Sequence, residues 1–116
     1  MVLSESLRKT KEFTQVYKNG ISYANRYLVM YKVENGLGKN RIGISVSKKV
    51  GNSVVRHRVT RLIRESYRLN QDKFFVGYDI VVVARAAAKD KQYKEIESAL
   101  LHVGKIHKIV KEMIES

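Results

Sequence analysis

The residues best suited to chemistry lie between positions 48 and 68. They are cationic or strongly hydrogen-bonding and follow one another closely: Lys48, Lys49, Asn52, Arg56, His57, Arg58, Arg61, Arg64 and Arg68. A guanidinium group presents several N–H donors in a flat fork that matches the oxygens of a phosphate. These residue types therefore indicate phosphate binding rather than nucleophilic or acid–base catalysis.

The spacing of apolar residues predicts that a helix over 53–69 carries most of these cations. At about 100° per residue, its buried stripe holds Val55, Val59, Leu62, Ile63, Ser66 and Leu69. The opposite side holds His57, Arg61, Arg64 and Arg68, and Arg56 and Arg58 flank it. Asn52 or Ser53 is placed to cap the first turn.

The charge on this helix is almost entirely of one sign, since Glu65 is its only acid. Arginines this closely spaced repel one another, and a face needed only for solubility would mix signs. Two interpretations stay open, a merely solvated face and a phosphate-binding face, and we favour the second.

The composition of the whole chain favours a nucleic-acid partner. With 116 residues, 23 Lys and Arg against 11 Asp and Glu, and a net charge of +12, it predicts one basic domain over 1–116. It has no cysteine, and its histidines lack the spacing of metal ligands, so we expect no metal held by the protein. No segment resembles a signal peptide or a transmembrane helix, which predicts a cytoplasmic protein.

The remaining segments predict a small α+β scaffold. Residues 1–9 read as a mobile basic arm, and Thr10 as the cap of a helix over 11–18. Strand patterns follow at 21–33, with alternation after Asn25, and at 41–47 and 78–84, with a hairpin loop at 34–39. A long amphipathic helix is expected over 91–115.

These elements predict an α/β sandwich in the order α-β-β-β-α-β-α. The early strands are expected to form an antiparallel meander, and 78–84, apolar on both faces, to be a central strand. The segment from 41 to 84 is a candidate βαβ unit with parallel strands. Gly43, Ser45 and Ser47 leave one strand face open to close approach, either by a packed helix or by a ligand backbone.

Phe13, Val16 and Tyr17 share one face of the first predicted helix. Aromatic residues at this spacing are typical of core contacts. On so short a helix they could equally border a groove, and both interpretations stay open.

The central motif, GISVSKKVGNSVVRHRVTRLIRE (43–65), resembles the signature of the bacterial ribonuclease P protein subunit. The segments FTQVYKNGISYANRYLVMYK (13–32) and YDIVVVAR (78–85) resemble that family in order and spacing, so the similarity spans roughly residues 7–110. Two positions depart from the family pattern. His57 stands where asparagine is usual and can still donate to a phosphate, whereas Thr60 stands where lysine is usual and removes one cation.

The resemblance implies a subunit that joins a catalytic RNA and helps to remove the 5′ leader of precursor tRNA. The active site and its Mg²⁺ would belong to the RNA, so the protein would carry no catalytic residue and bind no cofactor alone. We expect a monomer, one per RNA. The family also implies a left-handed βαβ crossover, against the usual right-handed rule.

The resemblance also implies two RNA-binding surfaces. The one for the catalytic RNA maps onto Lys48, Lys49, Asn52, Arg56, His57, Arg58, Arg61, Arg64 and Arg68. The one for the leader, a cleft between the first helix and the sheet, maps onto Phe13, Tyr17 and Tyr31, with Asn25 and Arg26.

Other classes fit the sequence less well. A ribosomal protein or general RNA chaperone would share the charge and the fold but would not distinguish precursor from mature tRNA. An autonomous nuclease would need acid–base or metal groups that converge in one pocket, and the sequence offers none. Binding to a membrane surface would call for bulky apolar residues on the basic helix.

Overall fold

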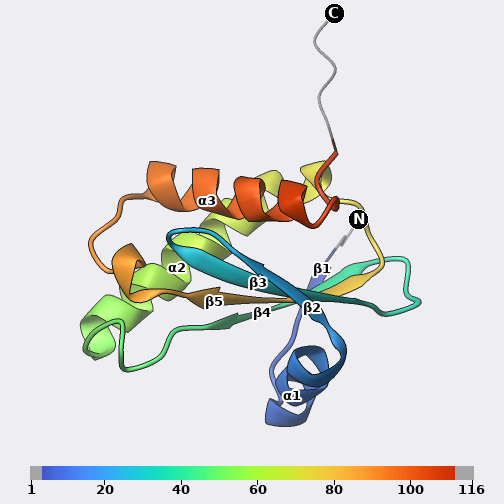
Figure 1. Cartoon of the computed structure of the whole chain (residues 1–116), viewed down its shortest axis with the longest axis horizontal. Coiled ribbons are helices and arrows are strands. Elements are labelled where there is room, and N and C mark those ends of the chain that lie inside the picture. The colour runs from blue at the N-terminus through green and yellow to red at the C-terminus, as the bar shows by residue number, and fades with distance from the viewer. Residues whose placement is uncertain (1–3, 112–116) are drawn as a thin grey trace, which may run out of the picture.

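The protein is a three-layer α+β sandwich, seen in a computed structural model that describes residues 4–111 (Figure 1). Its elements are β1 (Ser4–Ser6), α1 (Thr10–Asn19), β2 (Ile21–Ala24), β3 (Leu28–Glu34), β4 (Asn40–Ser45), α2 (Ser53–Asn70), β5 (Tyr78–Ala84) and α3 (Tyr93–Ile106). Helices α2 and α3 cover one face of the sheet, and α1 covers the other. The predicted fold class is confirmed, as is the predicted element order from α1 onward.

Strand β5 lies at the centre of the sheet, whose order is β1-β4-β5-β3-β2. It pairs parallel with β4, with Ile42 opposite Ile80, and antiparallel with β3. Ile80, Val81 and Val82 are fully buried, as a strand covered on both faces requires. The predicted central strand and the parallel pairing are confirmed, while the left-handed sense of the crossover stays a prediction.

The predicted meander is wrong at one connection. Strands β2 and β3 pair antiparallel as expected, but β3 and β4 do not pair, because β5 lies between them. Residues 34–39 are therefore not a hairpin loop. The backbone N–H of Asn35 donates to the carbonyl of Gly77 (2.9 Å), and its side chain donates to Asp79 Oδ1 (3.0 Å), which ties this connection to the start of β5.

Residues 4–7 of the predicted mobile arm are instead held against the sheet. Ser4–Ser6 form β1, which pairs parallel with β4 at the edge of the sheet, and Leu7 is buried against the α1 side. The N–H of Leu7 also donates to the carbonyl of Ile42 (2.8 Å). These contacts order a segment whose polar composition indicated none, and residues 1–3 lie outside the described part of the chain.

The last helix is shorter than predicted. Helix α3 ends at Ile106, Lys108 adopts a positive φ of 62°, and the N–H of Ile109 donates to the carbonyl of Gly104 (3.0 Å). Val110 then forms an antiparallel bridge with Phe74. The apolar residues Ile109 and Val110 thus cover the core in extended form, and positions 112–115 of the predicted helix lie outside the described residues.

Two apolar clusters hold the layers together. The larger one joins the sheet to α2 and α3 through residues such as Leu28 and Met30. The smaller one joins the sheet to α1 and includes Val16 and Val81, with Phe13 and Tyr31 packed against it. The alternation predicted for β3 is therefore confirmed, because its odd and even positions face different helices.

Candidate nucleic-acid interface

Helix α2 presents the predicted cationic face to solvent. The side chain of Asn52 caps it by accepting a hydrogen bond from the N–H of Val55 (3.0 Å). The predicted outward residues His57, Arg61, Arg64 and Arg68 are exposed, and Arg56 and Arg58 at the flanks are half-buried. The predicted buried residues Val59, Ile63 and Ser66 are buried, with Val55 and Leu62 partly so.

The buried stripe turns away from its predicted path in the last turn of α2. Leu69 is 53% exposed, so its predicted burial is wrong, and Tyr67 and Asn70 are buried instead. The Tyr67 hydroxyl lies 2.7 Å from Ser4 Oγ. Tyr67 follows Ile63 by four residues, a spacing that could have predicted its burial.

The exposed side of α2 carries a shallow pocket of about 260 Å³, lined by Ser53, Arg56, His57, Thr60 and Arg64. Within residues 4–111, Arg56, Arg61 and Arg64 form no ion pair with a carboxylate. Their guanidinium groups are therefore available to an external anion. The short side chain of Thr60, where the family pattern has lysine, lies in the wall of this pocket.

Two of the predicted RNA-binding arginines are already engaged. Arg68 pairs with Glu65, and its hydrogen bonds hold the pKa of the Glu65 carboxyl below its usual range. Arg58 donates from Nη2 to the carbonyl of Lys91 (2.6 Å) and from Nη1 to that of Lys89 (3.4 Å). Arg58 thus ties α2 to the segment that leads into α3, while Arg68 has its charge balanced locally.

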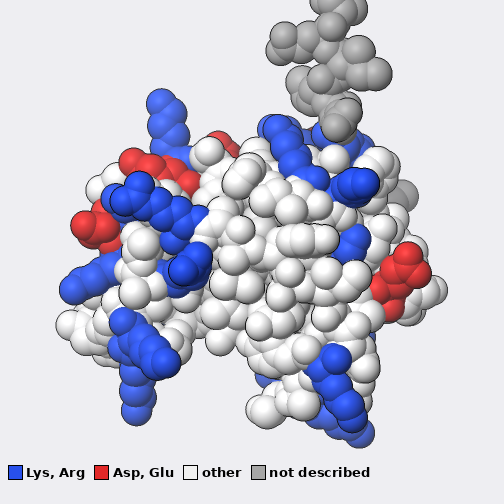
Figure 2. Space-filling view, viewed as in Figure 1, with Lys and Arg blue, Asp and Glu red and all other residues white. Residues whose placement is uncertain are grey.

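Lys48 and Lys49 extend the cationic surface beyond the start of α2. Both are exposed in the turn between β4 and α2, while Val50 beside them is buried. Figure 2 shows Lys and Arg side chains projecting around the end of the molecule where α2 begins. The structure therefore brings the predicted catalytic-RNA residues onto one region, with Arg68 at its far end.

The predicted aromatic residues of α1 and β3 form one cluster. The ring centroids of Phe13 and Tyr17 are 6.4 Å apart, and those of Tyr17 and Tyr31 are 4.9 Å apart in an edge-on arrangement. Tyr17 is 39% exposed, whereas Val16 is fully buried. On this face of α1, Val16 therefore belongs to the core, while Tyr17 leaves part of its ring accessible to solvent. The space over Gly43 is filled by the ring of Phe13, so a packed helix occupies it.

An ion-pair network anchors α1 over the sheet. Arg41 donates to both carboxylate oxygens of Asp79 (2.8 and 2.6 Å) and from Nη1 to Glu12 (3.3 Å). The other Glu12 oxygen accepts from the N–H of Lys9 (3.0 Å), so Lys9, and not the predicted Thr10, is the N-cap residue. Burial opposes ionisation of Asp79, but hydrogen bonds from Arg41 and Asn35 outweigh it and lower its pKa.

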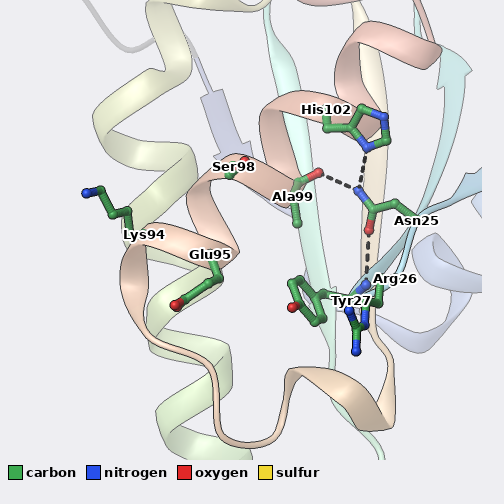
Figure 3. Close-up of a pocket in the computed structure, with 8 residues that line it drawn as sticks. All are labelled: Asn25, Arg26, Tyr27, Lys94, Glu95, Ser98, Ala99 and His102. Carbon is green, nitrogen blue, oxygen red and sulfur yellow. Dashed lines mark hydrogen bonds between the residues drawn. The ribbon is translucent and has the colours of Figure 1, made fainter.

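Asn25 and Arg26 do not join the aromatic cluster. Asn25 donates to the carbonyl of Ala99 (2.8 Å) and lies 3.2 Å from His102 Nδ1, both on α3. The guanidinium of Arg26 lies 5.8 Å from the ring centroid of Tyr27. The predicted leader-binding set is therefore divided between the two faces of the sheet, and Asn25 and Arg26 line a separate pocket beside α3 (Figure 3).

Neither a metal site nor a membrane segment stands out in residues 4–111. Within that range, no group of three or more His, Cys, Asp or Glu side chains could hold a metal ion. No helix there has the length and apolar character needed to cross a membrane.

Comparisons with known proteins agree with this geometry. The family model for ribonuclease P matches residues 1–108. The ribonuclease P protein component of Lachnoclostridium phytofermentans is 64% identical over 108 residues, 93% of either chain, and that of Alkaliphilus metalliredigens is 53% identical over 110 residues, 95% of this chain and 99% of that one.

Solved structures support the same assignment. The RNase P protein of Staphylococcus aureus superimposes with a TM-score of 0.79 at 38% identity, covering 91% of this chain and 97% of that one. The protein from Thermotoga maritima gives 0.81 at 30% identity, covering 97% and 99%. The chain therefore belongs to the ribonuclease P protein family, whose members are protein components of a tRNA-processing ribonucleoprotein.

Proposed function

We propose that this chain binds the catalytic RNA of a ribonuclease P through the cationic face of α2 and the turn before it. The observation that carries this proposal is a row of three arginines that form no ion pair with a carboxylate in the described part of the chain: Arg61 and Arg64, which are exposed, and Arg56, which is half-buried. Unpaired guanidinium groups gain most from phosphate contacts, because binding relieves their mutual repulsion. Lys48 and Lys49 extend the same surface.

The aromatic cluster on the α1 side is proposed to bind the 5′ leader of precursor tRNA. Tyr17 exposes part of its ring beside Tyr31, and unpaired bases stack on such rings with little dependence on sequence. Mature tRNA has no leader and would not make these contacts. The assembled enzyme would then bind its substrate more tightly than its product, which favours turnover.

In this proposal the chemistry belongs to the RNA. The active site and its Mg²⁺ would belong to the RNA, and the cationic side chains of the protein would lower the repulsion between the catalytic RNA and the precursor tRNA. We further propose one monomeric protein for each catalytic RNA.

A three-part cleavage assay tests the proposed function. A precursor tRNA with a 5′ extension is incubated at low Mg²⁺ and moderate salt with this chain, with a bacterial ribonuclease P RNA, or with both. We expect strong cleavage only in the mixture. Cleavage by the protein alone would indicate an autonomous nuclease, and tight binding without rescue would favour a ribosomal protein or RNA chaperone.

Replacement of Tyr17 by alanine tests the leader site. We expect about tenfold weaker binding of leader-bearing tRNA by the assembled enzyme, with affinity for mature tRNA unchanged. Tyr23→Ala is the matched control, since Tyr23 is similarly exposed (47%) but contacts His107 on the α3 side. Equal effects of the two variants would contradict the assignment of the aromatic cluster.

A further inference from the structure

A pocket of about 420 Å³ lies between the β2–β3 turn and α3, which lines it from Lys94 to His102 (Figure 3). Its volume falls within the range of small-ligand sites, about 300–1,000 Å³. It is lined by Asn25, Arg26, Tyr27, Lys94, Glu95, Ser98, Ala99 and His102. None of these residues belongs to the aromatic cluster or to the cationic face of α2.

We propose that this pocket receives an unpaired nucleotide of the catalytic RNA, an inference that rests on the proposed function. The base of this nucleotide would lie against Tyr27 and Ala99, and the phosphates on either side of it would contact Arg26 and Lys94. Tyr27 is half-buried. The Lys91 ammonium lies 5.5 Å from the centroid of its ring, and the Arg26 guanidinium lies 5.8 Å from the same centroid. Aromatic rings and guanidinium planes are the surfaces on which RNA-binding proteins stack unpaired bases.

The frame of the pocket is held by Asn25, whose amide is fully used. Besides its contacts with α3, its side-chain oxygen accepts from the N–H groups of Tyr27 (3.2 Å) and Leu28 (3.0 Å). The backbone carbonyl of Asn25 accepts a hydrogen bond from Arg85 Nη1 (2.8 Å). The pocket is therefore formed before any ligand arrives, and Asn25 has a structural role there.

The rim of the pocket offers positive charge. Arg26 and Lys94 are exposed, and within residues 4–111 neither pairs with a carboxylate. Glu95, the acid in the lining, accepts a hydrogen bond from the N–H of Gln92 (2.7 Å) as part of the α3 cap. Cations thus outnumber the acid, which favours a phosphate-bearing ligand over an acidic peptide or a neutral one.

The position of the pocket selects the catalytic RNA over the leader. The pocket lies on the sheet face covered by α2 and α3, and the aromatic cluster lies on the opposite face. Arg58 of α2 is hydrogen-bonded to the carbonyl of Lys91, and Lys91 in turn approaches Tyr27. The pocket therefore continues the cationic surface of α2 around the molecule.

A pair of double variants tests this inference against loss of general charge. Arg26→Ala/Lys94→Ala removes the rim cations, and Lys73→Ala/Lys105→Ala removes two exposed lysines near the other end of α3, of which Lys105 lies in its last turn. We expect the first pair to weaken binding of the catalytic RNA about tenfold and the second by about twofold or less at the same salt concentration. Discrimination between precursor and mature tRNA by the saturated holoenzyme should not change. Equal losses of affinity would overturn the inference.

Cross-linking from Ser98 identifies the RNA strand directly. The chain has no cysteine, so Ser98→Cys gives one attachment point for a photoactivatable group at the exposed rim. In the holoenzyme with precursor tRNA bound, we expect cross-links to an unpaired position of the catalytic RNA. Cross-links to the leader, or to neither RNA, would overturn the inference. Failure of the unmodified chain to bind the catalytic RNA would instead refute the proposed function, and the inference with it.

Discussion

The close contact between Gly43 of β4 and the ring of Phe13 predicts the effect of adding one methyl group. A Cβ on Gly43 would lie 2.5 Å from Phe13 Cζ, 2.7 Å from Cε1 and 3.2 Å from Leu7 Cβ. Carbon atoms in contact are ordinarily about 3.5–4.0 Å apart, so the ring would have to withdraw by about 1 Å. Leu7 is buried beside it and limits that movement.

The expected cost of Gly43→Ala follows from two opposing effects. Overpacking of this kind destabilises the folded protein by about 1–3 kcal/mol. Alanine also reduces the conformational freedom of the unfolded chain, which stabilises the folded protein by about 0.4–1 kcal/mol. We therefore expect the free energy of unfolding to fall by about 1–2 kcal/mol, measured by urea denaturation. Gly38→Ala is the matched control, because its added Cβ would meet nothing within 4 Å and its φ is not positive.

A second substitution makes the test specific. Phe13→Leu removes the ring atoms that the new methyl group would meet, so Gly43→Ala should cost less in that background. We expect a coupling energy of about 1 kcal/mol between the two positions. Additive effects, or a Gly43→Ala variant as stable as Gly38→Ala, would refute the close packing of α1 on β4.

Three further predictions concern charge. Arg61→Glu/Arg64→Glu should weaken binding of the catalytic RNA roughly a hundredfold in a filter-binding titration without changing thermal unfolding, and unchanged affinity would contradict the role of α2. Asp79→Asn should lower the free energy of unfolding at pH 7 by about 2 kcal/mol, because it weakens the pair with Arg41. The pKa of Asp79 is lowered in the folded protein, so its contribution to stability is present above the usual pKa of 3.8 and is lost as the pH falls through the folded-state pKa. Urea titrations should therefore show a smaller difference in free energy of unfolding between the original chain and Asp79→Asn at pH 3 than at pH 7. Burial lowers the pKa of His107 below its usual value of 6.5, so the folded protein favours the neutral ring. The unfolded chain therefore binds a proton more readily, and stability should decline as the pH falls from 7 through 6.5. His107→Gln should flatten this decline in melting curves recorded at pH 5, 6 and 7.

Local sequence patterns determined the elements that carry their own periodicity. In α2 the apolar stripe as far as Ser66, the Asn52 cap and the outward row from His57 to Arg68 were predictable, because helix geometry relates spacing to side. The apolar run of β5 likewise predicted a strand covered on both faces. The motif around residues 43–65 also led to the family, which the comparisons then confirmed.

Only the tertiary structure decided how these elements meet. Periodicity tells which side of an element is buried but not which element covers it, so the insertion of β5 between β3 and β4 was not predictable from spacing. The same reason explains Asn25, whose partner Ala99 is distant in the chain. Spacing predicted that Arg58 would be free to bind RNA, but in the folded protein its Nη2 lies 2.6 Å from the carbonyl oxygen of Lys91. Such long-range hydrogen bonds leave no periodic trace in the sequence, and they separate the available cations from the engaged ones.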